Sequence, residues 1–303
     1  IPLVYVLILN WNGKSDTIEC INSLKKIDYS NYKIIIIDNG STDDSIKVFK
    51  NKYPNIKIIE NKKNLGYAEG NNVGIRYALK NKVDYVLILN NDVVVDKNFL
   101  KELVKVGEIN EKVGIIGPKV YHYNTKIIQT LGIRNIFWNM FFYRRGIGRN
   151  KEDKGQLDSF TDMDAVPGCC IMIKSNVLKK VGILDKKLFL YYEETDLAVR
   201  TKNSGYLIKC STNSKVYHKE GSASKKVSGL SKYYSTRNSF IFIKRHFSLF
   251  KNILFIFKQI FIQIPIALII IIIKNKNKVI IRDYLRGVYA GFHYLFTNEI
   301  KKY

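Results

Sequence analysis

Four short apolar runs constrain the fold of this chain more than any other feature of its sequence. They are Leu3–Leu9, Ile34–Ile37, Ile56–Ile59 and Val83–Leu89. Aliphatic runs of this length bounded by polar residues are typical of buried strands, and apolar residues recur at helical spacing between them. Alternating strand and helix units predict a parallel, doubly wound sheet. We therefore expect an α/β fold with a mostly parallel central sheet.

Polar side chains follow three of these runs directly. Because ligands of open parallel sheets bind at the carboxyl ends of the strands, these side chains are candidates for a nucleotide-sized site. A lone carboxylate flanked by amides can also hold a divalent cation that contacts phosphate oxygens. The alternative is a set of plain turns, which Asn and Asp favour in any case. The residues are Asn10, Asn12, Asp38, Asn90, Asn91 and Asp92.

An acidic cluster lies about 100 residues downstream. Glu193, Glu194 and Asp196 follow an aromatic stretch and precede a helical pattern. Buried acids are costly and require a positive or metal partner, so this cluster predicts a functional site. The alternative is ordinary helix capping, because acidic side chains are favourable at a helix N-terminus.

The net charge of +24 is concentrated at the C-terminal end. Residues 199–303 hold 20 Lys and Arg against three Asp and Glu, which accounts for +17 of the total. Such a concentration indicates an anionic partner: nucleic acid, an anionic membrane surface or a phosphorylated substrate. The four cysteines show neither metal-ligand spacing nor a disulfide framework, so we expect a reducing cytoplasmic environment.

Three other classes of protein were weighed. A dinucleotide-dependent dehydrogenase is disfavoured, because the first strand is not followed by G-x-G-x-x-G. A nucleotidyltransferase acting on sugar phosphates needs a Gly-rich phosphate loop near its N-terminus, and Asn10–Gly13 does not form one. A non-catalytic basic protein that binds membranes or nucleic acid would fit the charge. However, the charge coincides with an Ile-rich amphipathic region, so no nucleic-acid partner is expected.

Taken together, these segments resemble inverting glycosyltransferases of family 2, and within them the rhamnosyltransferase-like branch. The resemblance covers about residues 4–238 and rests on five segments in the family's order. They are LILNWNG, IIDNGSTDDS, NLGYAEGNNVG, LILNNDV and FLYYEETDLAVR. It implies a GT-A fold with a single Rossmann-like domain, a nucleotide-sugar donor, Mg²⁺ or Mn²⁺, and an acceptor hydroxyl as the nucleophile.

The resemblance assigns roles on the donor side. Asn10 and Asn12 would line the base pocket, Asp38 would accept a hydrogen bond from the base, and Asn71 would lie beside the nucleotide. Asn90-Asn91-Asp92 stands where the family has its D-x-D motif, with Asn90 replacing the first acid. Asp92 is then the expected metal ligand. Asn90 would make a ribose or water-mediated contact, and Asn91 would lie beside the donor.

On the acceptor side, Glu193-Glu194 matches the family's Glu-Asp pair, whose second member is the catalytic base. Glu194 is therefore the expected base, with Gly168, Glu193 and Asp196 near the acceptor. A structural role for Asp196, paired with Arg200 four residues on, is the favoured reading of that residue. His218 falls where the family often has a histidine near the diphosphate, and it is a candidate second metal ligand.

The C-terminal third predicts membrane association. Processive members of the family carry Gln-x-x-Arg-Trp, whereas this chain has Tyr234-Ser-Thr-Arg-Asn238, so we expect single-sugar transfer. On a helical wheel, Lys244–Gln263 places basic and amide side chains opposite apolar ones, as an interfacial helix does. An amphipathic helix packed on the domain is the alternative. We expect Pro265 to end this helix, and a second basic, aromatic segment, Val279–Phe296, to extend the attachment.

These observations predict an organisation and a location. A glycosyltransferase domain would occupy residues 1–240, with a nucleotide-binding half at 1–95 and an acceptor-binding half at 96–240. Residues 241–303 would form a basic, hydrophobic helical region. This region would attach the protein peripherally to the anionic inner face of the cell membrane, within reach of a glycan or polyprenyl-phosphate-linked acceptor.

Overall fold

Eleven strands form one mixed sheet in the computed structural model, which describes residues 1–141, 146–159, 161–219, 228–273 and 278–303. The order along the main path is β3-β2-β1-β4-β10-β6-β11-β5. The strands on this path are β1 (Val4–Asn10), β2 (Tyr32–Asp38), β3 (Lys57–Glu60), β4 (Tyr85–Asn90), β5 (Val93–Val95), β6 (Val113–His122), β10 (Cys170–Lys174) and β11 (Leu207–His218). Three short strands extend the sheet: β7 (Ile127–Thr130), β8 (Lys151–Glu152) and β9 (Asp162–Met163).

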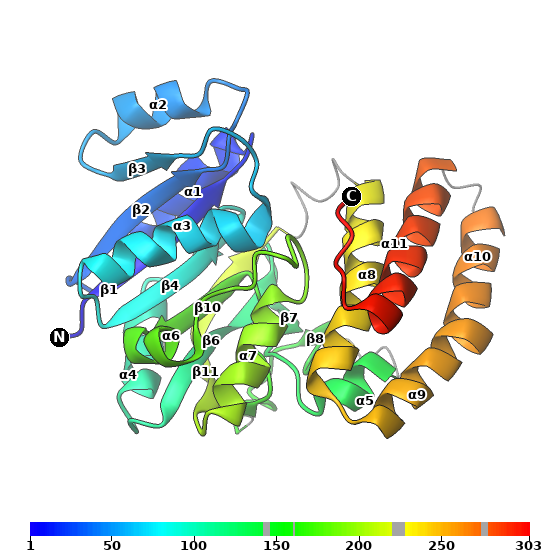
Figure 1. Cartoon of the computed structure of the whole chain (residues 1–303). Helices are drawn as coiled ribbons and strands as arrows, with labels where there is room; N and C mark the ends of the chain where they lie inside the picture. The colour runs from blue at the N-terminus through cyan, green and yellow to red at the C-terminus, as the bar shows by residue number, and fades with distance from the viewer. Residues whose placement is uncertain (142–145, 160, 220–227, 274–277) are drawn as a thin grey trace.

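The four expected N-terminal strands pair in parallel, which confirms the doubly wound half of the prediction. Helices cover both faces of the sheet (Figure 1). One face packs against α1 (Lys14–Leu24), α2 (Ser45–Lys52) and α4 (Phe99–Gly107). The other face packs against α3 (Gly66–Lys80), α6 (Ser175–Val181) and α7 (Glu193–Asn203). Buried aliphatic side chains alternate between these two layers along each strand, as a sheet covered on both faces requires.

Two strands complete the sheet beyond β6. β11 is one long strand that changes register against β6 between Ser211 and Lys215. The run after Asp92 forms β5, which leaves β4 and pairs antiparallel with the end of β11. As a result, β5 lies at the far end of the sheet from β1 and sets Asp92 beside the end of β11.

The C-terminal helices gather on one side of the sheet (Figure 1). They are α8 (Ser228–His246), α9 (Leu249–Lys258), a π-helical turn (Gln259–Gln263), α10 (Ile264–Ile273) and α11 (Lys278–Thr297), with the short α5 (Ile136–Phe141) beside α9. Aromatic clusters hold them together, for example Phe240 against Phe255 and Phe292. The proposed boundary at residue 240 therefore lies within α8.

Two expectations about this region are wrong. A single helix over Lys244–Gln263 does not form, because the chain is extended at Ser248 between α8 and α9. Pro265 does not end the second helix, which continues through α10. Proline removes a backbone donor and crowds the preceding turn, and the wider π-helical turn before Pro265 accommodates both effects.

Within the described residues, one helix, Leu249–Ile270, is long and apolar enough to cross a membrane by length and composition.

Candidate active site

The carboxyl edge of the parallel strands gathers the polar side chains that follow them. In the register of the sheet, Asn10 lies opposite Asp38, and Asn90 lies opposite Leu9 on the other side of β1. Three expected donor-side residues, Asn10, Asp38 and Asn90, therefore lie on adjacent strands although they span about 80 residues of the chain.

Asn10 and Asp38 form a buried network at this edge. The Asn10 amide donates to Asp38 Oδ1 at 2.8 Å, and its oxygen accepts from the Thr17 hydroxyl at 2.8 Å. Ser41 donates to the same Asp38 oxygen at 2.6 Å, and its backbone N–H donates to Asp38 Oδ2 at 2.9 Å. Both Asn10 and Asp38 are fully buried. Asn10 thus orients Asp38 and the turn after β2 instead of presenting a free amide.

Asn12 and Asn91 organise the neighbouring loops. Asn12 adopts a left-handed backbone conformation, and its side-chain oxygen accepts from the Thr42 backbone N–H at 2.8 Å. Asn91 donates to the Thr17 hydroxyl at 3.0 Å and so ties the end of β4 to the start of α1. These contacts hold the loops after β1, β2 and β4 in one arrangement.

Two amide oxygens in the site are buried without a hydrogen-bond partner in the described residues: Asn71 Oδ1 and Asn90 Oδ1. Asn71 is fully buried on α3 and donates only to the Tyr67 carbonyl, four residues before it. A buried acceptor left without a donor costs about 1–3 kcal/mol. Both oxygens therefore mark places where a bound ligand would supply a donor or a cation.

Asp92 lies beside His218, which is 126 positions later in the chain. His218 Nε2 is 3.2 Å from Asp92 Oδ1; the Asp92 side chain is buried, and that of His218 is 14% exposed. His218 Nδ1 donates to Gln129 Oε1 at 2.9 Å, which leaves Nε2 with the free lone pair whenever the imidazole is neutral. The β5–β11 pairing produces this contact, because it sets His218 opposite Val93.

The Asp92–His218 pair fits a divalent cation. A carboxylate oxygen and an imidazole nitrogen point at each other, with a buried amide oxygen on Asn90 two residues before Asp92. Burial by itself lowers the pKa of His218, but the neighbouring Cys169 and Asp92 groups outweigh it and raise that pKa to about 11. A cation and a proton would therefore compete for Nε2. No cluster of three or more His, Cys, Asp or Glu side chains occurs in the described part of the chain, so phosphate and water would have to complete the coordination.

Glu193 and Glu194 are adjacent carboxyls at the start of α7. Burial first, and then the charge of Glu194, raise the pKa of Glu193 well above its ordinary value. Burial also raises the pKa of Glu194, while a hydrogen bond from Glu193 opposes that rise. Neighbouring carboxyls with separated pKa values divide the acid and base roles between them. Because its pKa is raised further, Glu193 is the candidate for the protonated partner, and Glu194 is the candidate for the base.

The loop before this pair has an unusual backbone. Phe189, Tyr191 and Tyr192 all adopt left-handed conformations, which are uncommon for bulky residues. Asn238 on α8 donates its amide to three carbonyls of this loop, those of Leu188, Leu190 and Tyr191, at 2.8–2.9 Å. Because such a backbone persists only when its surroundings hold it, Asn238 positions the glutamate pair.

Arg237 also donates hydrogen bonds to this loop. Its side chain is almost completely buried and donates to the carbonyls of Lys187 and Leu188 and to that of Lys301 near the C-terminus. Burial first lowers the pKa of this guanidinium, and the faces of Tyr233 and Tyr234 lie 5.6 and 4.7 Å from it. The segment Tyr234–Asn238 therefore holds the loop that precedes the glutamate pair.

Gly168 and Cys169 lie next to Glu194 and to the Asp92–His218 pair. A side chain at Gly168 would approach Glu194 Oε1 to 3.2 Å, so glycine leaves room for the carboxylate. The next residue, Cys169, accepts the Asn90 backbone N–H at 2.9 Å and borders the His218 imidazole. Consecutive Cα atoms are only 3.8 Å apart. Glu194 and the Asp92–His218 pair therefore border two consecutive residues of the chain.

Asp196 serves the scaffold. Arg200 Nε donates to one of its carboxylate oxygens at 2.8 Å, as the spacing of four residues predicts, and His246 Nε2 contacts the other at 2.7 Å. Burial raises the pKa of Asp196, but these two partners outweigh it and lower that pKa below its ordinary value. Both oxygens are occupied, so Glu194 remains the better candidate for the base.

Several residues that shape the site were not singled out from the sequence. Tyr67 donates to the Gly168 carbonyl at 2.8 Å, and Gln129 orients His218. Ser41 and Thr17 complete the Asp38 network. Ser41 and Thr17 carry a detectable signal, since Ser41 lies in the turn after β2 and Thr17 lies near the start of α1. Tyr67 lies within the segment NLGYAEGNNVG. Gln129 carries no such signal, because only the tertiary fold brings it to the site.

Comparisons with known proteins place this chain. The profile of "Glycosyl transferase family 2" matches residues 5–182. The "dTDP-rhamnosyl transferase RfbF" of Shigella flexneri is 25% identical over 312 residues, which cover 96% of this chain and 98% of that protein. The "N-acetylglucosaminyl-diphospho-decaprenol L-rhamnosyltransferase" of Mycobacterium tuberculosis is 21% identical over 201 residues, 61% of this chain and 66% of that protein.

Solved structures show the same fold. The mannosyltransferase PcManGT from Pyrobaculum calidifontis, in complex with GDP-Man and Mn²⁺, aligns with a TM-score of 0.59 at 13% identity. The alignment covers 98% of this chain and 88% of that one. GalNAc-T7 with UDP, GalNAc and Mn²⁺ aligns with a TM-score of 0.55 at 16% identity over 72% of this chain. This chain spans less than half of that structure, 44%.

Proposed function

Since the chain belongs to glycosyl transferase family 2 and is a hexosyltransferase that uses a nucleotide-sugar donor, we propose that it moves one sugar to an acceptor hydroxyl in a metal-dependent, inverting reaction. The observation that carries this proposal is the placement of Glu194 beside Gly168 and of the Asp92–His218 pair beside Cys169. A carboxylate and a cation site close to each other suit this reaction. The acceptor hydroxyl needs a base, and the departing diphosphate needs positive charge. Family membership decides against the nucleotidyltransferase and the non-catalytic binding protein.

Glu194 is the general base of the proposed reaction. Its carboxylate takes the proton of the acceptor hydroxyl as that oxygen bonds to the anomeric carbon from the side opposite the leaving group. The bond between the anomeric carbon and the phosphate oxygen breaks, and the nucleoside diphosphate departs with that electron pair. Glu193, kept protonated by burial, donates to Glu194 and holds its orientation. No covalent bond between sugar and protein is required.

Asp92 and His218 would hold Mg²⁺ or Mn²⁺, with Asn90 close by. The cation supplies positive charge that stabilises the departing diphosphate. Residues at the carboxyl edge of the strands would bind the donor. Asp38 would accept a hydrogen bond from the nucleobase, and Asn12 and Asn71 would lie beside the nucleotide. The structures of PcManGT and GalNAc-T7 in complex with Mn²⁺ support this choice of cation.

A thermal-shift series tests the donor and metal assignment. Nucleoside diphosphates should raise the melting temperature by several degrees when Mn²⁺ is present and by much less when EDTA replaces it. A ligand at about 100 times its dissociation constant adds about 2.7 kcal/mol to the stability of the folded state. The parent nucleosides, which lack the diphosphate, are the matched control. Equal shifts with Mn²⁺ and with EDTA, or no shift with any diphosphate, would contradict the assignment.

We also propose that residues 241–303 attach the enzyme to the cytoplasmic face of the membrane, with residues 1–95 and 96–240 as its donor and acceptor halves. The helical stretch formed by α9 and the π-helical turn presents an apolar exterior and a polar interior. Its exposed residues include Leu249, Phe250, Ile253, Phe257 and Phe261, whereas Lys258, Gln259 and Gln263 are buried. Polar groups that face inward and apolar groups that face outward are the arrangement expected of a helix against lipid.

Vesicle flotation of the full chain tests this attachment. The wild type should float with vesicles containing phosphatidylglycerol, and high salt should weaken the binding because part of it is electrostatic. Replacing Phe250, Phe257 and Phe261 with aspartate should reduce the floating fraction at least about tenfold, since it removes the aromatic area that lipid would bury. Ile109→Asp with Leu207→Asp, at exposed apolar positions of the sheet half, is the control. Undiminished flotation of the triple variant would exclude this helix as the attachment.

A further inference from the structure

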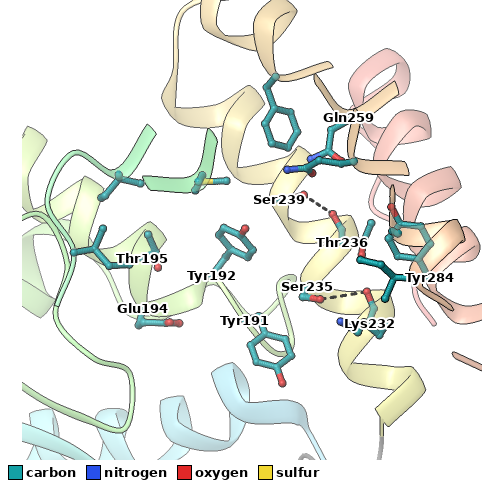
Figure 2. Close-up of a pocket in the computed structure, with 17 residues that line it drawn as sticks. Tyr191, Tyr192, Glu194, Thr195, Lys232, Ser235, Thr236, Ser239, Gln259 and Tyr284 are labelled. Atoms are coloured by element: carbon teal, nitrogen blue, oxygen red, sulfur yellow. Dashed lines mark hydrogen bonds between the residues drawn. The ribbon is translucent and has the colours of Figure 1, made fainter. Parts of the chain in front are cut away.

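A cavity of about 690 Å³ lies between the base and the C-terminal helices. Figure 2 shows Glu194 and Thr195 on one side of it and Tyr284 of α11 on the other, with α8 along the wall between them. Since Glu194 is part of this lining, a molecule in the cavity would have one end at the carboxylate that we assign as the base.

The polar part of the lining comes from two helices that face each other. Ser235, Thr236 and Ser239 contribute hydroxyl groups from α8, and Gln259 and Gln263 contribute amides from the π-helical turn. The two glutamines are only 5% and 7% exposed, although they belong to a helix whose outer surface is apolar. A π-helical turn inserts an extra residue into a helix and is frequent at functional sites.

The two glutamine amides are suited to sugar hydroxyls. Within the described residues, no side-chain hydrogen bond of the protein uses the amide of Gln259 or Gln263, whereas Ser235 and Ser239 donate to carbonyls of their own helix. Each primary amide offers two donors and one acceptor. A saccharide, which carries donors and acceptors on adjacent carbons, can use both amides at once.

The remaining lining is apolar and reaches the outer surface. Ala267 and Ile270 of α10 border the cavity, and Ile270 is also 46% exposed. Its neighbours Ile266 and Ile269 are exposed on the same helix. The cavity therefore changes from polar at Glu194 and the glutamines to apolar at α10, where it meets the surface that we assign to lipid.

We propose that this cavity is the acceptor site and that its ligand is a saccharide linked through phosphate to a hydrocarbon chain. The amides of Gln259 and Gln263 bind the hydroxyls of the saccharide and present one of them to Glu194. The hydrocarbon leaves over Ile270 along α10, and Lys232, the basic side chain among the described lining residues, contacts the linking phosphate. This inference rests on the proposed function, because it takes Glu194 as the base.

Equilibrium binding of two probes separates the polar and apolar parts of the site. The probes are N-acetylglucosaminyl-diphospho-farnesol and N-acetylglucosamine 1-phosphate, which lacks the chain. Wild-type protein should bind the farnesyl probe at least about tenfold more tightly, since each buried methylene contributes about 0.8 kcal/mol. Ile270→Ser should weaken only the farnesyl probe, by roughly three- to tenfold.

Gln259→Leu and Gln263→Leu should each weaken both probes by about three- to tenfold, because each removes one or two hydrogen bonds and keeps the apolar stem. Gln156→Leu, at an exposed position outside the cavity, is the matched control and should change neither. Equal affinity for the two probes, no binding of either, or unchanged binding in both glutamine variants would overturn the proposal. Mn²⁺-dependent binding of nucleoside diphosphates is measured on the same preparations. Absence of Mn²⁺-dependent nucleotide binding by the wild type would indicate instead that the proposed function fails.

Discussion

Replacing Glu194 with glutamine is expected to lower the rate of sugar transfer by about 10²–10⁴-fold, which is the usual contribution of a general base. Glutamine keeps the size and the hydrogen-bonding reach of the side chain but cannot accept the proton of the acceptor. Binding of a nucleoside diphosphate with Mn²⁺ should stay within about twofold, because Glu194 faces the cavity on the acceptor side. Transfer measured at saturating donor, together with calorimetry of nucleotide binding, checks both parts.

Glu193→Gln is the matched control for this substitution. Its amide can still donate to the Glu194 carboxylate, so transfer should fall by no more than about tenfold. An equal loss in the two variants would show that the pair supports the structure without dividing the acid and base roles.

The pH profile of the wild type gives an independent readout. A base must be deprotonated to act, so activity should fall as the pH falls through the pKa of Glu194. Because burial raises that pKa, the acidic limb should lie at higher pH than the ordinary value for glutamate. An acidic limb at or below the ordinary value would contradict the assignment.

Asp92→Asn is expected to weaken Mn²⁺-dependent nucleotide binding by roughly 100-fold, at least as much as the loss of an outer partner of a metal ligand costs. The substitution removes the carboxylate beside His218, and asparagine is a poor replacement for a charged oxygen ligand. Nucleotide binding measured in EDTA should change little, so the effect appears as lost metal dependence. Titration of Mn²⁺ at fixed nucleotide concentration measures it directly.

Two further variants sharpen that test. Asp96→Asn makes the same chemical change four residues later, where the carboxylate accepts only local backbone N–H groups, and it should leave metal dependence intact. Asn90→Asp would restore the first acid of the D-x-D pattern where an amide oxygen is buried without a partner. It should tighten Mn²⁺ binding. Unchanged metal dependence in Asp92→Asn would place the cation elsewhere.

Much of the parallel half of the fold follows from local patterns. The runs at β1, β2, β3 and β4 are continuous aliphatic segments with polar ends, and only a sheet covered on both faces buries such segments. Parallel strands also align their carboxyl ends, which is why Asn10, Asp38 and Asn90 could be expected at one edge before their contacts were known.

The C-terminal helices were harder to read. A helical wheel assumes one continuous helix, and the break at Ser248 invalidates it. A wheel also separates polar from apolar faces without saying which of them packs against the protein. In water the apolar face would be buried, whereas here Lys258, Gln259 and Gln263 are buried and Phe250, Phe257 and Phe261 are exposed.

The sequence by itself determined the family, the parallel strands and the chemical types at the site: amides and an acid at the strand ends, and a glutamate pair downstream. Only the tertiary structure decided how these groups meet. Asp92 reaches His218 because β5 pairs with the end of β11, and Glu194 is oriented because Asn238 holds a left-handed loop. These contacts join residues 47 to 126 positions apart. Their energies depend on shared burial and on exact partners, which a local pattern of residues does not encode.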